Sequence, residues 1–223
     1  TAEGRDGIAA MLAGTMATAR PGGFVLETAG VTADGGEEGW FGFETATGRG
    51  RGHVKLVEGR GFSLLTSLQA LKGFEEKQGF SRPEGVEWGA RKRRVTWRER
   101  REREIAELGH SVQPYVLIVG GGQGGIALAA RLRRLEVPAI VIDKLPRAGD
   151  AWRSRYKSLC LHDAVWYDHL PYLPFPAHWP VYTPKDQIGD WLEMYTNIME
   201  LNFWRSTECV GSRYDDAKGE WEV

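Results

Sequence analysis

The second half of the chain alternates short apolar runs with segments of helical periodicity. Residues 116–119 form a continuous apolar run of the kind found in buried parallel strands. Apolar residues then recur at helical spacing over residues 126–135, Pro138 interrupts that pattern, and residues 139–142 form a second apolar run. This order predicts a strand, a helix and a second strand, which together begin a doubly wound α/β sheet.

A further helix and a hairpin are predicted beyond a long aromatic segment. Thr183 as N-cap, Pro184 at the first helical position and Asp186 form a start that resembles a capping box. The apolar face of this helix is predicted to face the core and consists of Ile188, Trp191, Leu192, Tyr195, Ile198 and Met199. Tyr214 and Trp221 flank a turn and predict a hairpin.

The first 73 residues show a different pattern. Residues 6–19 read as a short helix, and glycine-rich turns separate the strand-like runs 24–27, 40–45, 52–57 and 62–71. One helix followed by an antiparallel meander predicts a small α+β domain. His53 lies in one of these strands, and we interpret it as a surface or hydrogen-bonded histidine.

Residues 74–113 are polar and charged, and they predict a helical linker between domains at 1–73 and 114–223. The basic cluster Arg91–Arg94 is typical of nucleic-acid binding. However, opposite charges follow it at i,i+4 spacing, which favours a solvated helix and no nucleic-acid partner: Arg98 with Glu102, Glu99 with Arg103, and Arg100 with Glu104.

Composition restricts the class of protein only moderately. The 223 residues carry a net charge of −1 and are 42% hydrophobic, which is typical of a globular protein without a strong overall field. No apolar run is long enough for a membrane span, and no signal peptide is present, so we expect a cytoplasmic protein. Cys160 and Cys209 are expected to be reduced thiols, and no metal site is predicted.

Glycines mark the turn between the first predicted strand and its helix. Gly120, Gly122 and Gly125 fit the spacing G-x-G-x-x-G, in which the glycines allow a tight turn, a close ligand and close helix packing. Amides at the start of the helix that follows Gln123 can meet phosphate oxygens. Asp143 ends the second strand, where a carboxylate accepts hydrogen bonds from ribose and disfavours a 2′-phosphate. The pattern therefore predicts a site for FAD or NAD.

An ordered series of residues follows Asp143. Gly149 and Trp152 are followed by the sequence YKSL at residues 156–159 and by Pro174–Pro176. This series resembles the flavin-containing monooxygenases, and most of all the bacterial and fungal relatives of plant YUCCA-like enzymes. Two departures are the Asp at 143, where the family more often has Glu, and Asp150, which replaces a second glycine.

The resemblance implies a Rossmann-like FAD-binding fold and a specific chemistry. It implies an NADPH-using monooxygenase that inserts one oxygen from O2, through a flavin C4a-hydroperoxide, into a small nitrogen or sulfur nucleophile, ketone or 2-oxo acid. It places His162 beside the flavin C4a as the candidate catalytic residue, although His162 could instead only bind backbone carbonyls. The implied cofactor-binding residues are Gly120, Gly122, Gln123, Gly124, Gly125, Asp143, Lys144, Gly149, Trp152 and His162. We interpret His169 and His178 as structural.

The first domain resembles the NTF2-like (SnoaL-like) domains that precede some flavin domains, on the segments at 39–56 and 63–76. We assign it no chemistry and expect its first helices to be missing. The NADPH motif is expected further downstream, so we expect an N-terminal fragment that cannot complete turnover.

Two other classes of protein stay open. The first is a flavin oxidoreductase that does not oxygenate, although a disulfide reductase would carry a cysteine pair after the second strand, where only Cys160 occurs. The second is a nucleotide-binding scaffold or regulatory module without enzymatic activity.

Overall fold

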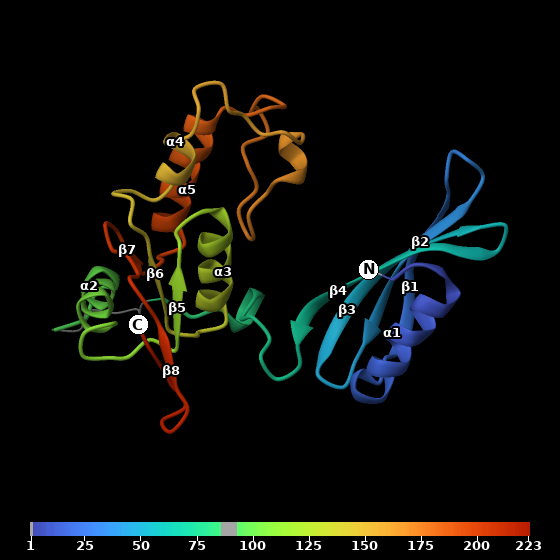
Figure 1. Ribbon diagram of the computed structural model, residues 1–223, viewed down its shortest axis with the longest axis horizontal. Coiled ribbons are helices and arrows are strands. Elements are labelled where there is room, and N and C mark those ends of the chain that lie inside the picture. Colours follow the sequence, from blue (N-terminus) through green and yellow to red (C-terminus); the bar gives the residue numbers. More distant parts are fainter. Residues whose placement is uncertain (1, 86–92) are drawn as a thin grey trace. The chain divides into compact units, whose positions relative to one another are not determined.

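A computed structural model describes residues 2–85 and 93–223 and divides the chain into two compact units, one ending at Glu76 and the other beginning at Lys77 (Figure 1). The first boundary lies close to the expected end at residue 73. Most of the expected linker, residues 74–113, is part of the second unit. Arg91 and Lys92 of the basic cluster lie outside the described residues.

The first unit consists of one helix and a four-stranded antiparallel sheet in the order β1-β2-β3-β4. This confirms the predicted helix and meander, and each strand is longer than its apolar run. The elements are α1 (Gly4–Ala19), β1 (Gly22–Val31), β2 (Glu37–Glu44), β3 (Gly48–Val57) and β4 (Arg60–Leu71).

Aromatic rings of β2 cover the glycines of β3. An added Cβ on Gly50 would lie 2.3 Å from the Phe43 ring, and one on Gly52 would lie 2.2 Å from the Phe41 ring. The glycines therefore leave the space that the rings occupy on one face of the sheet. On β3, His53 lies 3.4 Å from a Glu38 carboxylate oxygen, so it has a protein partner as expected.

The second unit contains a three-stranded parallel sheet in the order β5-β6-β7 and a separate hairpin of β8 and β9. The predicted strands at 116–119 and 139–142, the helix between them and the hairpin are all confirmed. The elements are a 3-10 turn (Gly79–Ser81), α2 (Trp97–Glu107), β5 (Val116–Val119), α3 (Gln123–Arg134), β6 (Ala139–Ile142), α4 (Asp150–Arg153), a second 3-10 turn (Val165–Tyr167), α5 (Lys185–Ile198), β7 (Phe203–Trp204), β8 (Arg213–Asp215) and β9 (Glu220–Glu222).

Both faces of the parallel sheet are covered. Alternate residues of β6 point to opposite faces, so Val141 joins the main core with α3 and α5, whereas Ile140 and Ile142 pack on the other face with Leu108. Figure 1 shows α2 and α3 on opposite sides of the sheet. Leu108, which follows α2, is thus a core residue of the second unit.

The start of α5 differs from the prediction. The helix begins at Lys185, with Pro184 as its N-cap, and the Thr183 hydroxyl donates to the Pro180 carbonyl at 3.0 Å. The predicted capping box does not form, because Thr183 is turned back towards the preceding loop. The prediction that Ile198 belongs to the apolar face that meets the core is also wrong, because Ile198 is 61% exposed in the last turn of α5.

The charge pairs predicted along α2 form only in part. Arg98 and Glu102 pair at 3.7 Å on the exposed side. Glu99 instead closes a capping box with Thr96, accepting from the Thr96 N–H at 2.7 Å, while the Thr96 hydroxyl accepts from the Glu99 N–H. The helix is therefore not wholly solvated, because Glu104 points to the interior and bonds to α3.

Candidate functional site

The glycine loop joins the end of β5 to the start of α3. Gly120 has a φ of 106°, a conformation that favours glycine, and its N–H donates to Ile142 O at 2.9 Å. An added Cβ on Gly125 would lie 2.0 Å from Gly120 O, so α3 packs directly against the turn. Beside Gly122 and Gly124 no atom lies within 4 Å of an added Cβ. The three motif glycines therefore occupy the positions that a dinucleotide loop requires.

The first turn of α3 is suited to an anion. Its first intrahelical bond runs from Ile126 N to Gly122 O, at 3.0 Å, so the preceding amides have no acceptor within the helix. The first turn holds no acidic residue, while the last turn carries Arg131, Arg133 and Arg134. The partial positive charge of the helix start is thus not neutralised by a carboxylate of that turn.

Asp143 lies beside the glycine loop, as the sequence predicts. One carboxylate oxygen accepts from Gly121 N at 2.6 Å and the other accepts from Leu145 N at 2.8 Å. A carboxylate has about four acceptor positions, so two remain for a ligand. Asp143 therefore both fixes the loop and keeps the capacity to accept from hydroxyl groups.

The short helix α4 brings Trp152 to the same loop. Gly149, at φ 87°, precedes it, and an added Cβ there would lie 2.1 Å from Gly189 O on α5. The indole N–H of Trp152 donates to the Gln123 side-chain oxygen at 3.0 Å. Four of the predicted residues, Gly120, Gln123, Asp143 and Trp152, are thus linked to one loop.

Asp150, which replaces the second glycine of the family pattern, has a structural explanation. Its carboxylate lies 2.9 Å from the Arg153 guanidinium and 3.3 Å from that of Arg147. Burial raises the pKa of Asp150, but Arg153 and Arg147 outweigh burial and hold the pKa below its usual range. The substitution therefore adds an ion pair within the first turn of α4.

Two of the predicted residues are not brought to the loop by any contact within the described residues. Lys144 is exposed directly after Asp143, and His162 is exposed directly after the buried Leu161. Their cofactor contacts, and the catalytic role of His162, stay predictions.

The aromatic segment between α4 and α5 forms a packed cluster. The Phe175 ring stacks on Trp179 at 5.0 Å and stands edge-on to Trp191 at 5.3 Å. The His169 ring nitrogen Nδ1 accepts from Phe175 N at 3.0 Å, so His169 has a structural role, as expected. The Trp191 indole nitrogen is buried without a hydrogen-bond partner among the described residues.

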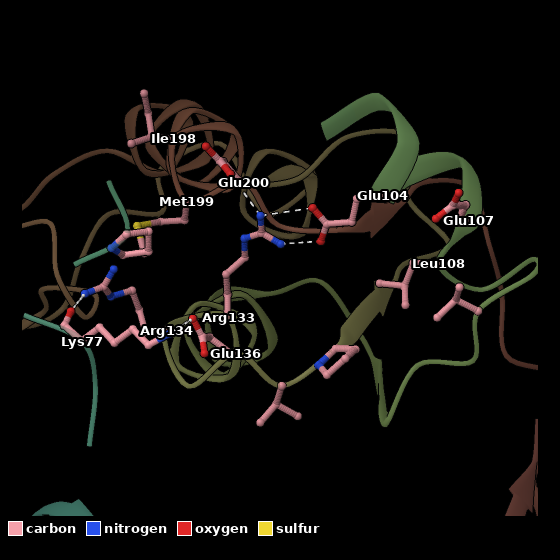
Figure 2. A pocket seen from close by; sticks show the side chains of 14 residues that line it. Lys77, Glu104, Glu107, Leu108, Arg133, Arg134, Glu136, Ile198, Met199 and Glu200 are labelled. Atoms are coloured by element: carbon pink, nitrogen blue, oxygen red, sulfur yellow. Dashed lines mark hydrogen bonds and ion pairs between the residues drawn. The ribbon is translucent and has the colours of Figure 1, made fainter. Parts of the chain in front are cut away.

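A polar network that the sequence did not predict connects α2, α3 and the segment directly after α5. Glu104 accepts from both terminal nitrogens of Arg133, and Arg133 also donates to Glu200 at 3.0 Å (Figure 2). Burial raises the pKa of Glu104, but hydrogen bonds from Arg133 and Asn202 together have the larger effect and hold the pKa below its usual range. The only indication of this network in the sequence was that residues far apart along the chain carry opposite charges.

The network lines a cavity of about 700 Å³ at the C-terminal end of α3, which is the end opposite the glycine loop (Figure 2). Its other cations also have protein partners. Lys77 pairs with Glu136 at 2.6 Å, and Arg134 donates to Lys77 O at 2.7 Å. We therefore assign the cavity no ligand.

Within residues 2–85 and 93–223, no group of three or more His, Cys, Asp or Glu side chains could hold a metal ion. No helix there is long and apolar enough to cross a membrane. Cys160 and Cys209 are both free thiols, as predicted.

The loop, the helix start and the acid at the end of β6 have the arrangement expected of a dinucleotide-binding α/β unit. About half of the chain is similar in sequence to flavin monooxygenases. It is 38% identical over 109 residues to "Probable indole-3-pyruvate monooxygenase YUCCA8" of Arabidopsis thaliana and 35% identical over 111 residues to indole-3-pyruvate monooxygenase YUCCA1 of rice, Oryza sativa subsp. japonica. These matches cover 48% and 49% of this chain. They confirm the predicted resemblance.

The matched segment spans only about a quarter of the length of these relatives, 25% and 27%. A bacterial relative, the "Uncharacterized oxidoreductase CzcO-like" of Geobacillus kaustophilus, is 34% identical over 101 residues, which are 45% of this chain and 29% of the relative. No family model matches the chain.

Solved structures with a similar arrangement include a flavin-containing monooxygenase from Stenotrophomonas maltophilia, at a TM-score of 0.43 and 23% identity over 48% of this chain and 34% of that one. A bacillithiol disulfide reductase from Staphylococcus aureus has a TM-score of 0.41 at 14% identity, over 44% of this chain and 29% of that one.

Proposed function

We propose that this chain carries the FAD-binding part of an NADPH-using monooxygenase that inserts one oxygen atom from O2 into a small organic substrate. The observation that carries the proposal is the geometry of the glycine loop, with Gly125 against Gly120 and open space beside Gly122 and Gly124. The similarity to indole-3-pyruvate monooxygenases supports the flavin over other dinucleotides.

The residues present fit a dinucleotide. The amides at the start of α3 would bind the pyrophosphate, and the remaining acceptor positions of Asp143 would bind ribose hydroxyls. Trp152 would hold Gln123 from the side of α4, and Gly149 lets α4 pack closely on α5. The redox chemistry, which is hydride acceptance from NADPH and reaction with O2, would be supplied by FAD when it is bound. His162, exposed in a loop, is the proposed hydrogen-bond donor to the reacting part of the flavin.

Several finer assignments belong to the same proposal. NADPH would be the hydride donor, and the substrate would be a nitrogen or sulfur nucleophile, a ketone or a 2-oxo acid. The first unit would be an NTF2-like domain that ends near residue 73, and the protein would be cytoplasmic.

The experiment that tests the proposal measures flavin binding and then its chemistry. Purified protein should bind FAD and absorb near 450 nm, roughly the flavin band. A colourless protein that binds no added FAD would refute both enzyme hypotheses and leave the scaffold. NADPH oxidation under air by the full-length protein, with hydrogen peroxide measured alongside, then separates the two enzymes. Complete conversion of NADPH to peroxide with amines, sulfides, ketones and 2-oxo acids would favour the non-oxygenating oxidoreductase.

The same assay tests His162. In a full-length protein, His162→Ala should raise the fraction of NADPH that is lost as peroxide. An unchanged fraction would exclude the proposed role of His162.

A further inference from the structure

The hydrogen bond between Trp152 and Gln123 fixes the orientation of an amide. The indole N–H of Trp152 is a donor only, and it donates to the Gln123 oxygen at 3.0 Å. The amide oxygen must therefore face the indole. The two amide protons consequently lie on the opposite side of the group.

Gln123 lies where those protons can reach an anion. It is the first residue of α3 and is exposed, between Gly122 and Gly124. Neither glycine has an atom within 4 Å of an added Cβ, so a ligand can approach the backbone on both sides of Gln123. The side-chain NH2 thus adds donors beside backbone amides that have no acceptor within the helix.

Trp152 can orient the amide because α4 is firmly anchored. The helix has only four residues, but the Arg153 guanidinium, whose side chain is 12% exposed, donates to Asp150 at 2.9 Å, to Asp190 at 2.9 Å and to Glu193 at 2.8 Å. Lys185 donates to Arg153 O at 2.6 Å. These bonds join α4 to α5 and limit movement of the indole.

We infer that Trp152 is a positioning residue, which turns the Gln123 amide so that its NH2 group donates to the pyrophosphate of the bound dinucleotide. This inference rests on the proposed function. Without the indole N–H, the amide could turn its oxygen towards the phosphates, and the hydrogen bond would be lost.

A double-mutant cycle on nucleotide binding tests the inference, with ADP as the probe because it carries the pyrophosphate. Gln123→Ala should weaken ADP binding about tenfold, the effect of one hydrogen bond to a charged group. Trp152→Phe keeps most of the ring but loses the N–H, and should weaken binding by a similar factor. In the Gln123→Ala background, Trp152→Phe should change binding by less than about twofold.

The controls separate positioning from loss of structure. Trp221→Phe in β9 makes the same substitution at a residue outside the site and should leave ADP binding unchanged. Gln123→Glu keeps the size of the side chain but replaces the NH2 donors by an anion, so it should weaken ADP binding more than Gln123→Ala does. Circular dichroism and thermal unfolding should match the wild type for every variant.

Three results would overturn the inference. Independent effects of the two substitutions in the cycle would show that Trp152 acts without Gln123. Unchanged binding by Gln123→Ala would show that the amide does not contact the ligand. Failure of the wild type to bind ADP and FAD would overturn the proposed function, and the inference with it, whereas the first two results leave FAD binding intact.

Discussion

The close packing of α3 on the glycine loop predicts opposite effects for two neighbouring glycines. Gly124 and Gly125 both lie in the first turn of α3, and both should gain helix propensity on substitution by alanine. An added Cβ on Gly125 would lie 2.0 Å from Gly120 O, whereas one on Gly124 meets no atom within 4 Å. The pair therefore isolates the cost of steric contact from the gain in propensity.

The size of the effect follows from the contact. A carbon and a carbonyl oxygen normally lie more than 3 Å apart, so Gly125→Ala must move a backbone carbonyl or the whole helix by about 1 Å. Such overpacking costs about 1–3 kcal/mol, and the gain in propensity, up to about 1 kcal/mol, offsets only part of it. We expect Gly125→Ala to lower the free energy of unfolding by about 1–2 kcal/mol and Gly124→Ala to raise it by about 0.5–1 kcal/mol.

Urea denaturation followed by circular dichroism measures both changes, with a second transition allowed because the chain contains two units. Gly125→Ala should also weaken FAD binding, because displacement of α3 opens the loop. Equal stability of the two variants would refute the packing argument. A Gly125→Ala protein as stable as the wild type would show that the helix moves aside at no cost.

Three further predictions follow from other contacts. Glu104→Gln should destabilise the second unit by about 1–2 kcal/mol, because Arg133 loses a charged partner in a half-buried network. Since the folded-state pKa of Glu104 is lowered, its stabilisation is present above the usual Glu pKa and is lost as the pH falls through the folded value. Urea denaturation can be measured at several pH values between 3 and 7, a range that includes the ordinary carboxyl pKa of about 4. The free energy of unfolding should fall less with decreasing pH in the variant than in the wild type. Tyr195→Phe should cost about 1 kcal/mol, because the buried hydroxyl donates to a carbonyl at 2.7 Å. Burial raises the pKa of Tyr195 to about 12, so wild-type stability should fall as the pH rises from the usual value through 12, and alkaline denaturation should show a smaller fall in the variant. In the first unit, Gly50→Ala should lower the melting temperature and Gly61→Ala should not, because only the first added Cβ meets a ring, at 2.3 Å.

Local patterns predicted the parts of the fold that depend on neighbours in sequence. The apolar runs at 116–119 and 139–142 are strands with those bounds, because a strand buried on both faces needs apolar residues throughout. The prediction for the start of α5 was less accurate. Thr183 has the side chain of an N-cap, but its hydroxyl bonds to Pro180 O, and the preceding loop decides between the two partners.

Contacts between distant segments could not be predicted in the same way. The i,i+4 rule pairs Glu104 with Arg100, yet Glu104 bonds to Arg101 at i−3 and to two distant residues, Arg133 of α3 and Asn202 just before β7. Tertiary partners are preferred because a half-buried carboxylate gains more from a half-buried guanidinium and an amide than from an exposed arginine. The segment expected to be a linker belongs to the second unit because of another distant contact, in which Leu108 packs on Ile140 and Ile142.

Gly121 shows how a distant contact can determine a residue that the motif leaves open. The spacing G-x-G-x-x-G requires glycine at 120, 122 and 125 but permits any residue at 121. In this protein an added Cβ at 121 would lie 2.2 Å from the Phe203 ring and 2.9 Å from the Asp143 carboxylate, which accepts from Gly121 N. The short Asp side chain and the Phe203 ring thus occupy the space beside the loop. The glycine at position 121 and the Asp in place of the more usual Glu are consequently two parts of one contact, and neither can be explained from the glycine spacing alone.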